Sequence, residues 1–300
     1  MRSTHALDGK VVVVTGASSG FGKGAARAFA EKGARVVLAA RRAELLRALA
    51  VELEQAGHEA LDVPTDVSRK EEVERLAQTV VARFGRIDVW INDAGVGVIG
   101  PFAKVPLDDH VKVIETNLLG TLYGSYFAYR QFLVQGSGVL LNVASELGRH
   151  TVPYYTSYAA AKHGVVGLDD ALQQELLQRG SDAIHVCTVL PTAHDTPFFE
   201  HAGNYTGHEV QAPKPLHDPQ AVVEALLKLA VDPKDNDIVG ADGIAKVVLK
   251  NLAPGLAKKA GARQMHATQM KGPPAEDTPG AVQSPMSSGV GVKGGLEDRS

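Results

Sequence analysis

Three side chains with complementary proton chemistry are brought together by their spacing. Tyr158 and Lys162 lie four residues apart in an alanine-rich segment typical of a helix start, so both should lie on one face, one turn apart. Ser145 follows the apolar run 139–141, which is typical of a buried strand, and a loop can carry its hydroxyl over that face. A phenol, an ammonium and a hydroxyl at one place form a proton-transfer site.

Each of these groups has a use in carbonyl chemistry. An unperturbed tyrosine titrates near pH ~10 and is a poor base at neutrality. A nearby ammonium favours the phenolate, so we expect Lys162 to lower the pKa of Tyr158. The Ser145 hydroxyl can hydrogen-bond the oxygen on which charge develops during carbonyl reduction. Tyr-x-x-x-Lys alone is common, however, and a helix start capped by Ser157 with a surface Tyr and Lys also explains it.

A glycine-rich turn near the N-terminus indicates a dinucleotide site. The β-branched run 10–15 is typical of a buried strand, and it is followed by a helix over 25–32 and a second strand over 35–40. Glycines between strand and helix let the backbone approach a pyrophosphate, whose charge is met by the helix N-terminus. We therefore expect cofactor contacts from Gly16, Ser18, Ser19, Gly20, Phe21 and Gly22.

The end of the second strand predicts which dinucleotide binds. An NAD site needs an acidic residue there to accept hydrogen bonds from the ribose 2′-hydroxyl. The chain instead has Arg41 and Arg42, and a guanidinium suits a 2′-phosphate. The alternative is that both arginines only solvate a helix start, but the helix dipole disfavours cations in the first turn. The sequence thus predicts NADP(H) in preference to NAD(H), bound through Arg41.

Strand and helix patterns alternate along the rest of the chain. Further strands are expected over 61–67, 87–95 and 184–191 with helices between them, which predicts an α/β fold with a doubly wound parallel sheet. A helix over 108–135 holds Asn117 near its centre. Because Asn is a poor interior helix residue, we expect a specific role for it.

Composition narrows the class of protein. A chain of 300 residues with 44% hydrophobic and 22% charged residues can bury one large core, and a net charge of −3 gives no reason to expect nucleic acid. The single Cys187 cannot form an internal disulfide, no signal peptide is recognisable, and no run approaches the ~20 apolar residues of a membrane span. We expect a cytoplasmic protein. We expect no metal site, because the histidines of one loop lack carboxylate or thiolate partners at ligand spacing: His194, His201 and His208.

The motifs together carry a family resemblance. The chain resembles the short-chain dehydrogenase/reductase family, which has a Rossmann fold, over about residues 8–245. The motifs stand in the family's order and spacing: Thr15-Gly16-xxx-Gly20-x-Gly22, Asp66-Val67, Asn92-x-Ala94-Gly95, Asn117, Ser145 and Tyr158-xxx-Lys162. Each motif alone is loose, but the set is specific.

The resemblance implies a role for each motif. Tyr158 would exchange a proton with the substrate oxygen, Lys162 would hold the nicotinamide ribose and lower the Tyr158 pKa, and Ser145 would polarise the carbonyl. Asn117 would hold a water that links Lys162 to solvent. Cofactor contacts would also come from Asp66, Val67, Asn92, Ala94, Gly95, Pro191 and Thr196. Pairing of two long helices into a homodimer or homotetramer is implied as well.

Two positions depart from the family pattern. Asp93 stands where the family usually has a second Asn, and Thr192 follows Pro191 where the family usually has Gly. Both changes leave the proton-transfer group intact, although Asp93 could alter how the fourth strand is braced.

A long connection over 192–219 corresponds to the family's substrate lid, and it is longer than a compact fold needs. Phe198 and Phe199 give it apolar surface, and Tyr154 and Tyr155 would border the same cavity. These aromatic residues favour an apolar small-molecule substrate, although aromatic residues in a lid can also simply pack it down.

Two segments follow the reductase domain, which we expect over 8–245. Residues 246–270 carry Lys and Arg but no acid, and Pro254 interrupts their apolar face. They should form a helical extension that packs on the body or a neighbouring subunit; a membrane-surface contact is the less favoured alternative. Of the last 30 residues, 14 are Gly, Pro or Ser, so 271–300 should be a disordered tail.

These observations predict an NADP(H)-dependent oxidoreductase that interconverts a carbonyl and a secondary alcohol. One alternative is a sensor or scaffold that binds NADP(H) with little turnover, but such a protein does not need the whole set of Asn117, Ser145, Tyr158 and Lys162. A second alternative is reduction of a 3-oxoacyl thioester, which basic residues at the mouth of the lid would favour.

Overall fold

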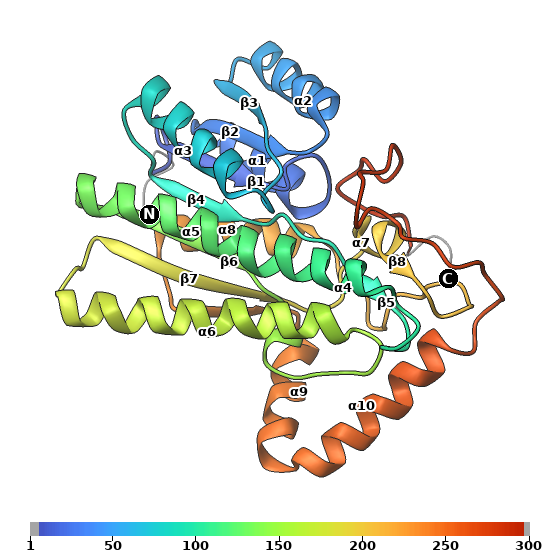
Figure 1. The fold of residues 1–300 in the computed structure, drawn as a ribbon. Coiled ribbons are helices and arrows are strands. Elements are labelled where there is room, and N and C mark those ends of the chain that lie inside the picture. Colours follow the sequence, from blue (N-terminus) through green and yellow to red (C-terminus); the bar gives the residue numbers. More distant parts are fainter. Residues whose placement is uncertain (1–5, 297–300) are drawn as a thin grey trace.

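A seven-stranded parallel sheet forms the centre of the molecule. A computed structural model describes residues 6–296, apart from the side chains of Ala241, Ile244, Lys250 and Asn251. Within these residues the central sheet has the strand order β3-β2-β1-β4-β6-β7-β9. Its strands are β1 (Val11–Thr15), β2 (Arg35–Ala40), β3 (Ala60–Pro64), β4 (Val89–Asn92), β6 (Gly138–Val143), β7 (Ile184–Pro191) and β9 (Asn236–Val239). This order confirms the predicted doubly wound α/β fold (Figure 1).

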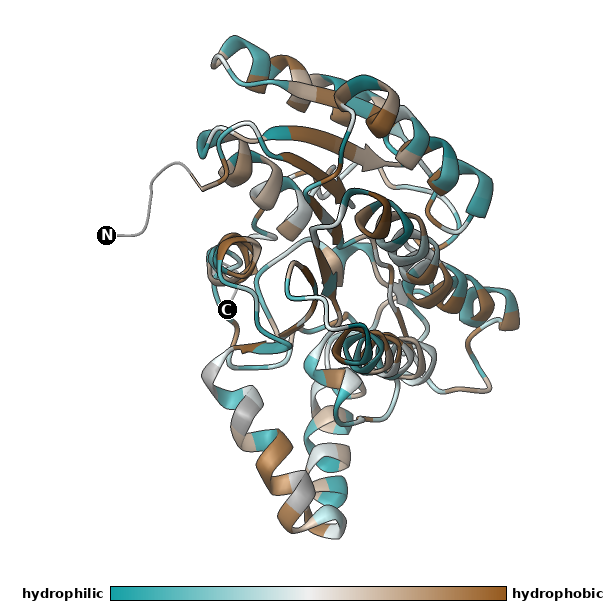
Figure 2. Ribbon diagram, turned by 90° about the vertical axis from the view of Figure 1, so that its left-hand side faces the viewer, coloured by the Kyte–Doolittle hydropathy of each residue, from teal (hydrophilic) through white to brown (hydrophobic). Residues whose placement is uncertain are grey.

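Helices cover both faces of this sheet (Figure 1). One layer contains α1 (Gly20–Glu31), α2 (Ala43–Gln55) and α8 (Gln220–Val231), and the other contains α3 (Lys70–Phe84), α5 (Gly120–Gln135) and α6 (Thr156–Arg179). Side chains alternate along β1, so that Val12 and Val14 pack against the first layer and Val11 and Val13 against the second. Both faces are therefore buried, and the central strands are coloured as hydrophobic in Figure 2.

A crevice forms where the strand order reverses. β1 pairs with β2 on one side and with β4 on the other. In sheets of this kind, ligands bind outside the carboxyl ends of the strands at such a reversal. Thr15 ends β1, and its Oγ1 accepts hydrogen bonds from the N–H groups of Asp93 (3.1 Å) and Ala94 (3.2 Å), just beyond β4. The loops after the two strands are thereby held side by side.

The helix predicted over 108–135 is divided in the structure. It consists of α4 (Leu107–Ile114), a single π-helical turn (Glu115–Leu119) and α5. The π-helical turn contains Asn117, which makes two hydrogen bonds with the backbone of Val96, one to its N–H and one to its carbonyl, both at 2.8 Å. Turns of this kind are rare and occur frequently at functional sites, which agrees with the specific role expected for Asn117.

The long connection after β7 is fixed by a second, smaller sheet. β5 (Val98–Ile99) pairs in parallel with β8 (Gly203–Asn204), and α7 (Phe198–His201) precedes β8. The connection therefore lies against the loop after β4 at the carboxyl end of the central sheet.

Two helices project from the body as a hairpin (Figures 1 and 2). They are α9 (Ala241–Leu252) and α10 (Pro254–Gln269), and Pro254 separates them as predicted. The helical extension thus begins before the predicted residue 246. Among the described residues, no helix has the length and apolar character needed to cross a membrane.

The segment after α10 differs from its predicted disorder. Residues 271–296 lie against the body, where bridges join Thr278 to Asn204 and Pro274 to His208. Composition alone does not reveal this packing, because several of the contacts are made by backbone groups, which every residue type carries. Residues 297–300, for which disorder was also predicted, lie outside the described part of the chain.

Candidate active site

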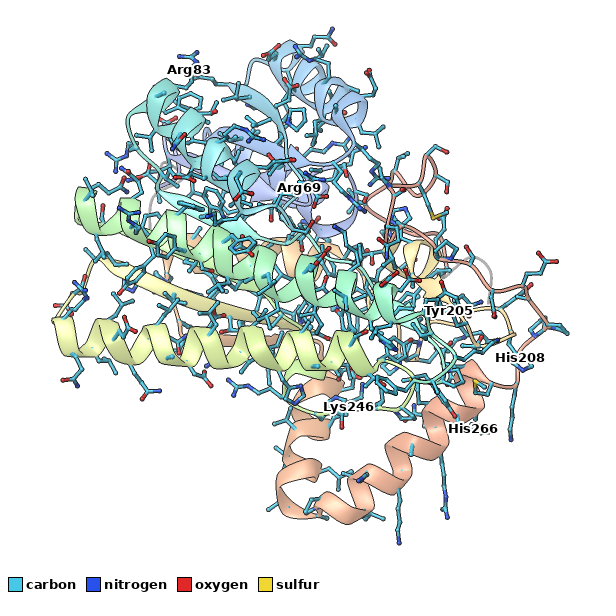
Figure 3. All side chains as sticks on the ribbon, in the orientation of Figure 1. Arg69, Arg83, Tyr205, His208, Lys246 and His266 are labelled. Atoms are coloured by element: carbon cyan, nitrogen blue, oxygen red, sulfur yellow. The ribbon has the colours of Figure 1, made fainter. Side chains whose placement is uncertain are left out.

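A cavity of about 610 Å³ lies along the carboxyl ends of the central strands. Its walls come from the glycine loop after β1, from the loops after β2, β3, β4, β6 and β7, and from α7 and α10. Figure 3 shows the side chains on the ribbon and labels Lys246, one of the residues that line the cavity.

The three predicted proton-transfer residues all line this cavity. Tyr158 and Lys162 lie in the first two turns of α6, on one face of the helix. Ser145 follows β6 and begins a short 3₁₀ turn, in which its Oγ accepts a hydrogen bond from the N–H of Leu147 at 3.1 Å. The Ser145 hydroxyl lies beside Tyr158 and favours its phenolate. The structure therefore brings together the group that sequence spacing predicted.

Enclosure in the cavity controls the charge of this group. Burial raises the pKa of Tyr158 to about 12; the hydrogen bond from Ser145 opposes this change, while Asp93 and Glu146 reinforce it. Burial also lowers the pKa of Lys162 to about 8. The pKa of Tyr158 is thus raised and not lowered as expected, because loss of solvent destabilises the phenolate more than its neighbours stabilise it. Near neutrality the phenol is protonated, which is the form that can donate a proton to a carbonyl oxygen.

Asp93 is a site residue that sequence reasoning treated only as a departure from a pattern. Its side chain lines the cavity. Burial raises its pKa to about 7, and the positive charge of Lys162 and a hydrogen bond from the Gly22 N–H oppose the change. Its sequence signal was an acidic residue at the end of a buried strand, directly before Ala94 and Gly95. The carboxylate and the Lys162 ammonium therefore influence one another.

Two predictions near the start of α6 are wrong. Ser157 lies inside the helix rather than capping it, and its Oγ is 2.9 Å from Nδ1 of His110. Tyr154 is not among the residues that line the cavity, because its hydroxyl is hydrogen-bonded at 2.7 Å to the ring of His266 on α10 (Figure 3). Its φ of 73° belongs to the left-handed region, which no simple sequence pattern predicts for tyrosine.

The glycine loop has the close packing that a dinucleotide site requires. A Cβ on Gly16, whose φ is +75°, would lie 2.9 Å from the N atom of Ala94, and a Cβ on Gly22 would lie 2.5 Å from the Gly16 carbonyl oxygen. Gly22 does not line the cavity and instead lets α1 pack against the loop. α1 begins at Gly20, so its first N–H groups lie at the cavity wall and can meet a pyrophosphate.

Two arginines, Arg41 and Arg42, line the cavity next to the glycine loop. The part of the cavity between this loop and the arginines is called the inner half here, and the part beyond Tyr158 the outer half. Arg42 donates hydrogen bonds from Nε to Ser18 Oγ (3.0 Å) and from Nη2 to Ser19 Oγ (2.6 Å), which ties its guanidinium to the glycine loop. The prediction named only Arg41, and Arg42 lines the same wall. Both cations beside the first N–H groups of α1 fit a dinucleotide that carries an additional phosphate.

The remaining predicted cofactor residues divide into two sets. Those that line the cavity are Ser18, Ser19, Phe21, Asp66, Val67, Ala94, Gly95, Pro191 and Thr196. The predicted cofactor residue Asn92 is not among the lining residues, and neither is Asn117 of the predicted catalytic group. Asn92 is buried within the core, where Nδ2 donates to Asn142 Oδ1 at 2.8 Å and so joins β4 to β6. Asn117 acts on the cavity through Val96, which lines it.

The outer half of the cavity is apolar. Tyr155, Phe198 and Phe199 line it as predicted, and the ring centroids of Tyr158 and Phe198 are 5.3 Å apart. Sequence reasoning missed the wall that α10 supplies, which includes Ala257, Gly261 and Met265. Only the fold reveals this wall, because α10 lies about a hundred residues from Tyr158 along the chain.

A salt bridge fixes the base of the α9–α10 hairpin beside the site. Lys246 Nζ lies 3.0 Å from each carboxylate oxygen of Glu146, the residue after Ser145 (Figure 3).

The three histidines of the long connection each contact a backbone carbonyl oxygen. His194 contacts that of Thr192, His201 that of Ser288 and His208 that of Gly272. Within the described residues, no three side chains of His, Cys, Asp or Glu gather as potential metal ligands.

Comparison with other proteins finds a matching family model and similar oxidoreductases. The family model described as short chain dehydrogenase matches residues 10–205. The uncharacterized oxidoreductase YxnA of Bacillus subtilis (strain 168) is 36% identical over 265 residues, covering 88% of this chain and 74% of the relative. An uncharacterized oxidoreductase of Staphylococcus aureus (strain USA300) is 37% identical over 228 residues, covering 76% of this chain and 94% of the relative.

Two solved structures are also similar. A short chain dehydrogenase/reductase from Burkholderia phymatum in complex with NAD has a TM-score of 0.75 and 25% identity, covering 84% of this chain and 96% of that one. An alcohol dehydrogenase from the archaeon Thermococcus sibiricus complexed with 5-hydroxy-NADP has a TM-score of 0.67 and 30% identity, covering 77% of this chain and 96% of that one.

Proposed function

The chain belongs to the short-chain dehydrogenase family, and from that premise we propose that it is an NADP(H)-dependent oxidoreductase that interconverts a carbonyl and a secondary alcohol on an apolar small molecule. The observation that carries this proposal is the presence of Tyr158, Ser145 and Lys162 in one cavity with the glycine loop and two arginines. The two similar solved structures, one with NAD and one with 5-hydroxy-NADP, support a nicotinamide cofactor.

The inner half of the cavity would hold the cofactor. The N–H groups at the start of α1 would bind the pyrophosphate, and Arg41 and Arg42 would bind the 2′-phosphate. Asp66 and Val67 line the wall after β3, where an adenine would lie. When bound, the reduced nicotinamide supplies the hydride that reaches the carbonyl carbon.

The protein's own residues handle the proton. Ser145 Oγ donates a hydrogen bond to the carbonyl oxygen and fixes it beside the Tyr158 hydroxyl. As that oxygen gains negative charge, the Tyr158 O–H bond breaks and its proton forms the alcohol O–H. Lys162, whose Nζ donates to the Val143 carbonyl at 2.7 Å, is held beneath the ring and stabilises the phenolate that remains. The reverse reaction returns the proton from the alcohol to the phenolate.

The apolar outer half of the cavity supports the substrate class. Phe198 on α7 and Met265 on α10 line this part of the cavity together with Tyr155, and Met265 and Tyr155 belong to one apolar cluster. Because these apolar side chains are better covered by an apolar group than by water, they favour a substrate with such a group next to its reacting carbonyl.

One observation favours the second candidate, a 3-oxoacyl thioester. Lys214 and Lys258 are exposed and line the cavity at its rim, on the long connection and on α10 respectively. Cations in this position suit the phosphates of a carrier group outside the cavity, while the acyl chain occupies the apolar part.

Calorimetric titration with NADPH and NADH tests the proposal, followed by NADPH oxidation with ketones, aldehydes and acyl thioesters. We expect tight NADPH binding and turnover of apolar ketones or of acyl thioesters, and the preferred group separates the two candidates. Binding without turnover across all three groups would favour a sensor, and binding of neither dinucleotide would contradict the proposal.

We also propose that two copies pair through α5 and α6. Their outer faces expose Tyr126, Val134 and Leu177, three large apolar side chains. Sedimentation velocity over a range of concentrations tests this, and a monomer at all concentrations would contradict it.

A further inference from the structure

The C-terminal segment 278–296, here called the strap, runs along the cofactor half of the cavity. In Figure 1 it is the dark red chain beside α7 and β8. Ala281, Pro285 and Met286 line the cavity, so the strap forms part of its wall. The family match ends at residue 205, well before this segment begins.

Backbone carbonyls of the strap accept hydrogen bonds from the guanidinium groups of Arg41 and Arg42. Arg41 donates from Nη2 to the Ala281 carbonyl at 2.7 Å and from Nη1 to the carbonyls of Val282 (3.4 Å) and Gln283 (3.3 Å). Arg42 donates from Nη1 to the carbonyls of Met286 (3.3 Å) and Ser288 (3.2 Å). These guanidinium groups are the ones that would bind a 2′-phosphate.

The strap also reaches the pyrophosphate end of the cavity. The N–H of Gly20, the first residue of α1, donates to the Gly291 carbonyl at 2.9 Å. The neighbouring Lys23 donates from Nζ to the Val290 carbonyl at 3.0 Å. Neutral carbonyl oxygens thus stand where the oxygens of a bound dinucleotide would be.

Other contacts anchor the strap independently of the arginines. Val282 is fully buried in the apolar cluster that contains Val96 and Val98. Lys293 forms a salt bridge with Asp218 at 2.6 Å, and the N–H of Leu296 donates to Asp195 Oδ1 at 2.9 Å. The strap is therefore held on the body by contacts other than those with the arginines.

The same donors cannot serve the strap and a phosphate at once. A guanidinium presents its N–H donors in one fixed plane, and bidentate phosphate binding uses two adjacent nitrogens. Arg42 directs four of its five N–H groups at the hydroxyls of Ser18 and Ser19 and at two strap carbonyls, so it has no pair of adjacent donors left. Arg41 directs Nη1 and Nη2 at the strap and keeps an N–H on Nε and one on Nη2. A 2′-phosphate bound on the Nη1–Nη2 edge of Arg42 therefore displaces strap carbonyls, whereas a dinucleotide without this phosphate leaves the arginine contacts in place.

We propose that the strap is a selectivity element that competes with the 2′-phosphate of NADP(H) for Arg41 and Arg42. This inference rests on the proposed function, which supplies the dinucleotide. NADPH binds fully only to molecules in which the strap has released the arginines. The apparent dissociation constant of NADPH therefore equals its intrinsic value divided by the fraction of such molecules. Affinity for NADH changes less, because NADH competes with the strap at the Gly20 N–H and Lys23 but not at the arginines.

Three variants test the strap directly. A chain that ends at Gly280 lacks every strap residue that contacts the arginines. Full-length Gly289→Val keeps those residues but should unseat them, because Gly289 has φ +62° and a Cβ there would lie 2.2 Å from the His201 Nε2. The matched control is a chain that ends at Leu296, which retains all the strap contacts described here. Circular dichroism and thermal melting verify that each variant is folded.

Calorimetry then gives the dissociation constants of NADPH and NADH for each chain. We expect NADPH to bind at least about tenfold more tightly to the shortened chain and to Gly289→Val, NADH to change by about threefold or less, and the control to match the full chain. Unchanged or weaker NADPH binding, or equal gains for both dinucleotides, would overturn the inference. If neither dinucleotide binds any chain, the proposed function itself fails.

Hydrogen exchange in the full chain gives a second readout. The N–H groups of Gly294 and Leu296 donate to the Asp195 carbonyl and carboxylate. Displacement of the strap predicts faster exchange of these amides with saturating NADPH than with saturating NADH. Slower exchange with NADPH would mean that the strap closes over the cofactor, which contradicts competition.

Discussion

The Nζ atom of Lys162 lies 5.7 Å from the centroid of the Tyr158 ring. The lysine donates its hydrogen bond to the Val143 carbonyl and is only 5% exposed, so it is fixed in place. Its positive charge therefore acts on the phenol through space. Asp93 opposes that effect, because it raises the pKa of both residues. The acid/base group of this site is thus a set of interacting charges rather than a single side chain.

Alcohol oxidation should depend steeply on pH. The reaction in this direction requires the Tyr158 phenolate, and the pKa of the phenol is raised to about 12 by burial. Below this pKa the phenolate fraction rises about tenfold per pH unit, so the oxidation rate should rise with pH throughout the range from about 7 to 10. Carbonyl reduction uses the phenol, which stays protonated over that range, so its rate should change much less with pH than the rate of oxidation. Steady-state kcat in both directions tests this, and an oxidation plateau below about pH 8 would contradict it.

Asp93→Asn should move the rising limb of alcohol oxidation to lower pH. The substitution removes a negative charge that raises the pKa of Tyr158. It also removes a charge that supports the Lys162 ammonium, but the pKa of Lys162 is lowered to about 8, so this loss matters little at higher pH. The kcat profile of the variant is compared with that of Asp182→Asn, which alters an exposed carboxylate. Coincident profiles for both variants would remove Asp93 from the account.

Arg41→Asp should weaken NADPH binding by about 10- to 100-fold and NADH binding by much less, since only NADPH loses charge-assisted hydrogen bonds. Calorimetry measures both dissociation constants. The control is Arg83→Asp on α3, an exposed arginine outside the cavity (Figure 3). Arg41→Asp also releases the strap, which would strengthen NADPH binding, so a net loss must come from the phosphate contact. Equal losses for the two dinucleotides would exclude a 2′-phosphate site at Arg41.

Met265→Ala should raise the KM of an apolar ketone several-fold without altering NADPH affinity. Met265 is 7% exposed and belongs to the apolar cluster around Tyr155, so the substitution removes part of the substrate wall. Leu256→Ala on the same helix is the control, because Leu256 is 63% exposed. If both variants give the same KM, α10 does not contact the substrate; melting curves show whether either change unfolds the hairpin.

The sequence predicted the fold and the proton-transfer group because both depend on local patterns. Apolar runs such as that at β1 determine strands, and a spacing of four residues in a helix places Tyr158 and Lys162 on one face. The cofactor loop was equally visible, since its glycines stand between a strand and a helix.

The features that the sequence did not predict depend on distant parts of the chain. Nothing near Tyr154 indicates that α10 will accept its hydroxyl, and nothing near Asn92 shows that Asn142 will draw its amide into the core. The strap is the clearest example. Arg41 contacts Ala281 through a backbone carbonyl, and every residue type carries such a carbonyl, so the side-chain pattern holds no trace of the interaction. The pKa of Tyr158 likewise depends on its enclosure, which only the folded chain provides.

The measurement that tests the central claim most directly is kcat for NADPH-dependent carbonyl reduction by Tyr158→Phe, with the NADPH dissociation constant measured on the same preparation. The variant loses only the hydroxyl that donates the proton. We predict a fall in kcat of about 10²- to 10⁴-fold, with the dissociation constant unchanged within about twofold. A kcat close to that of the unaltered protein would contradict the assignment of Tyr158 as the acid/base, and with it the mechanism proposed for this site.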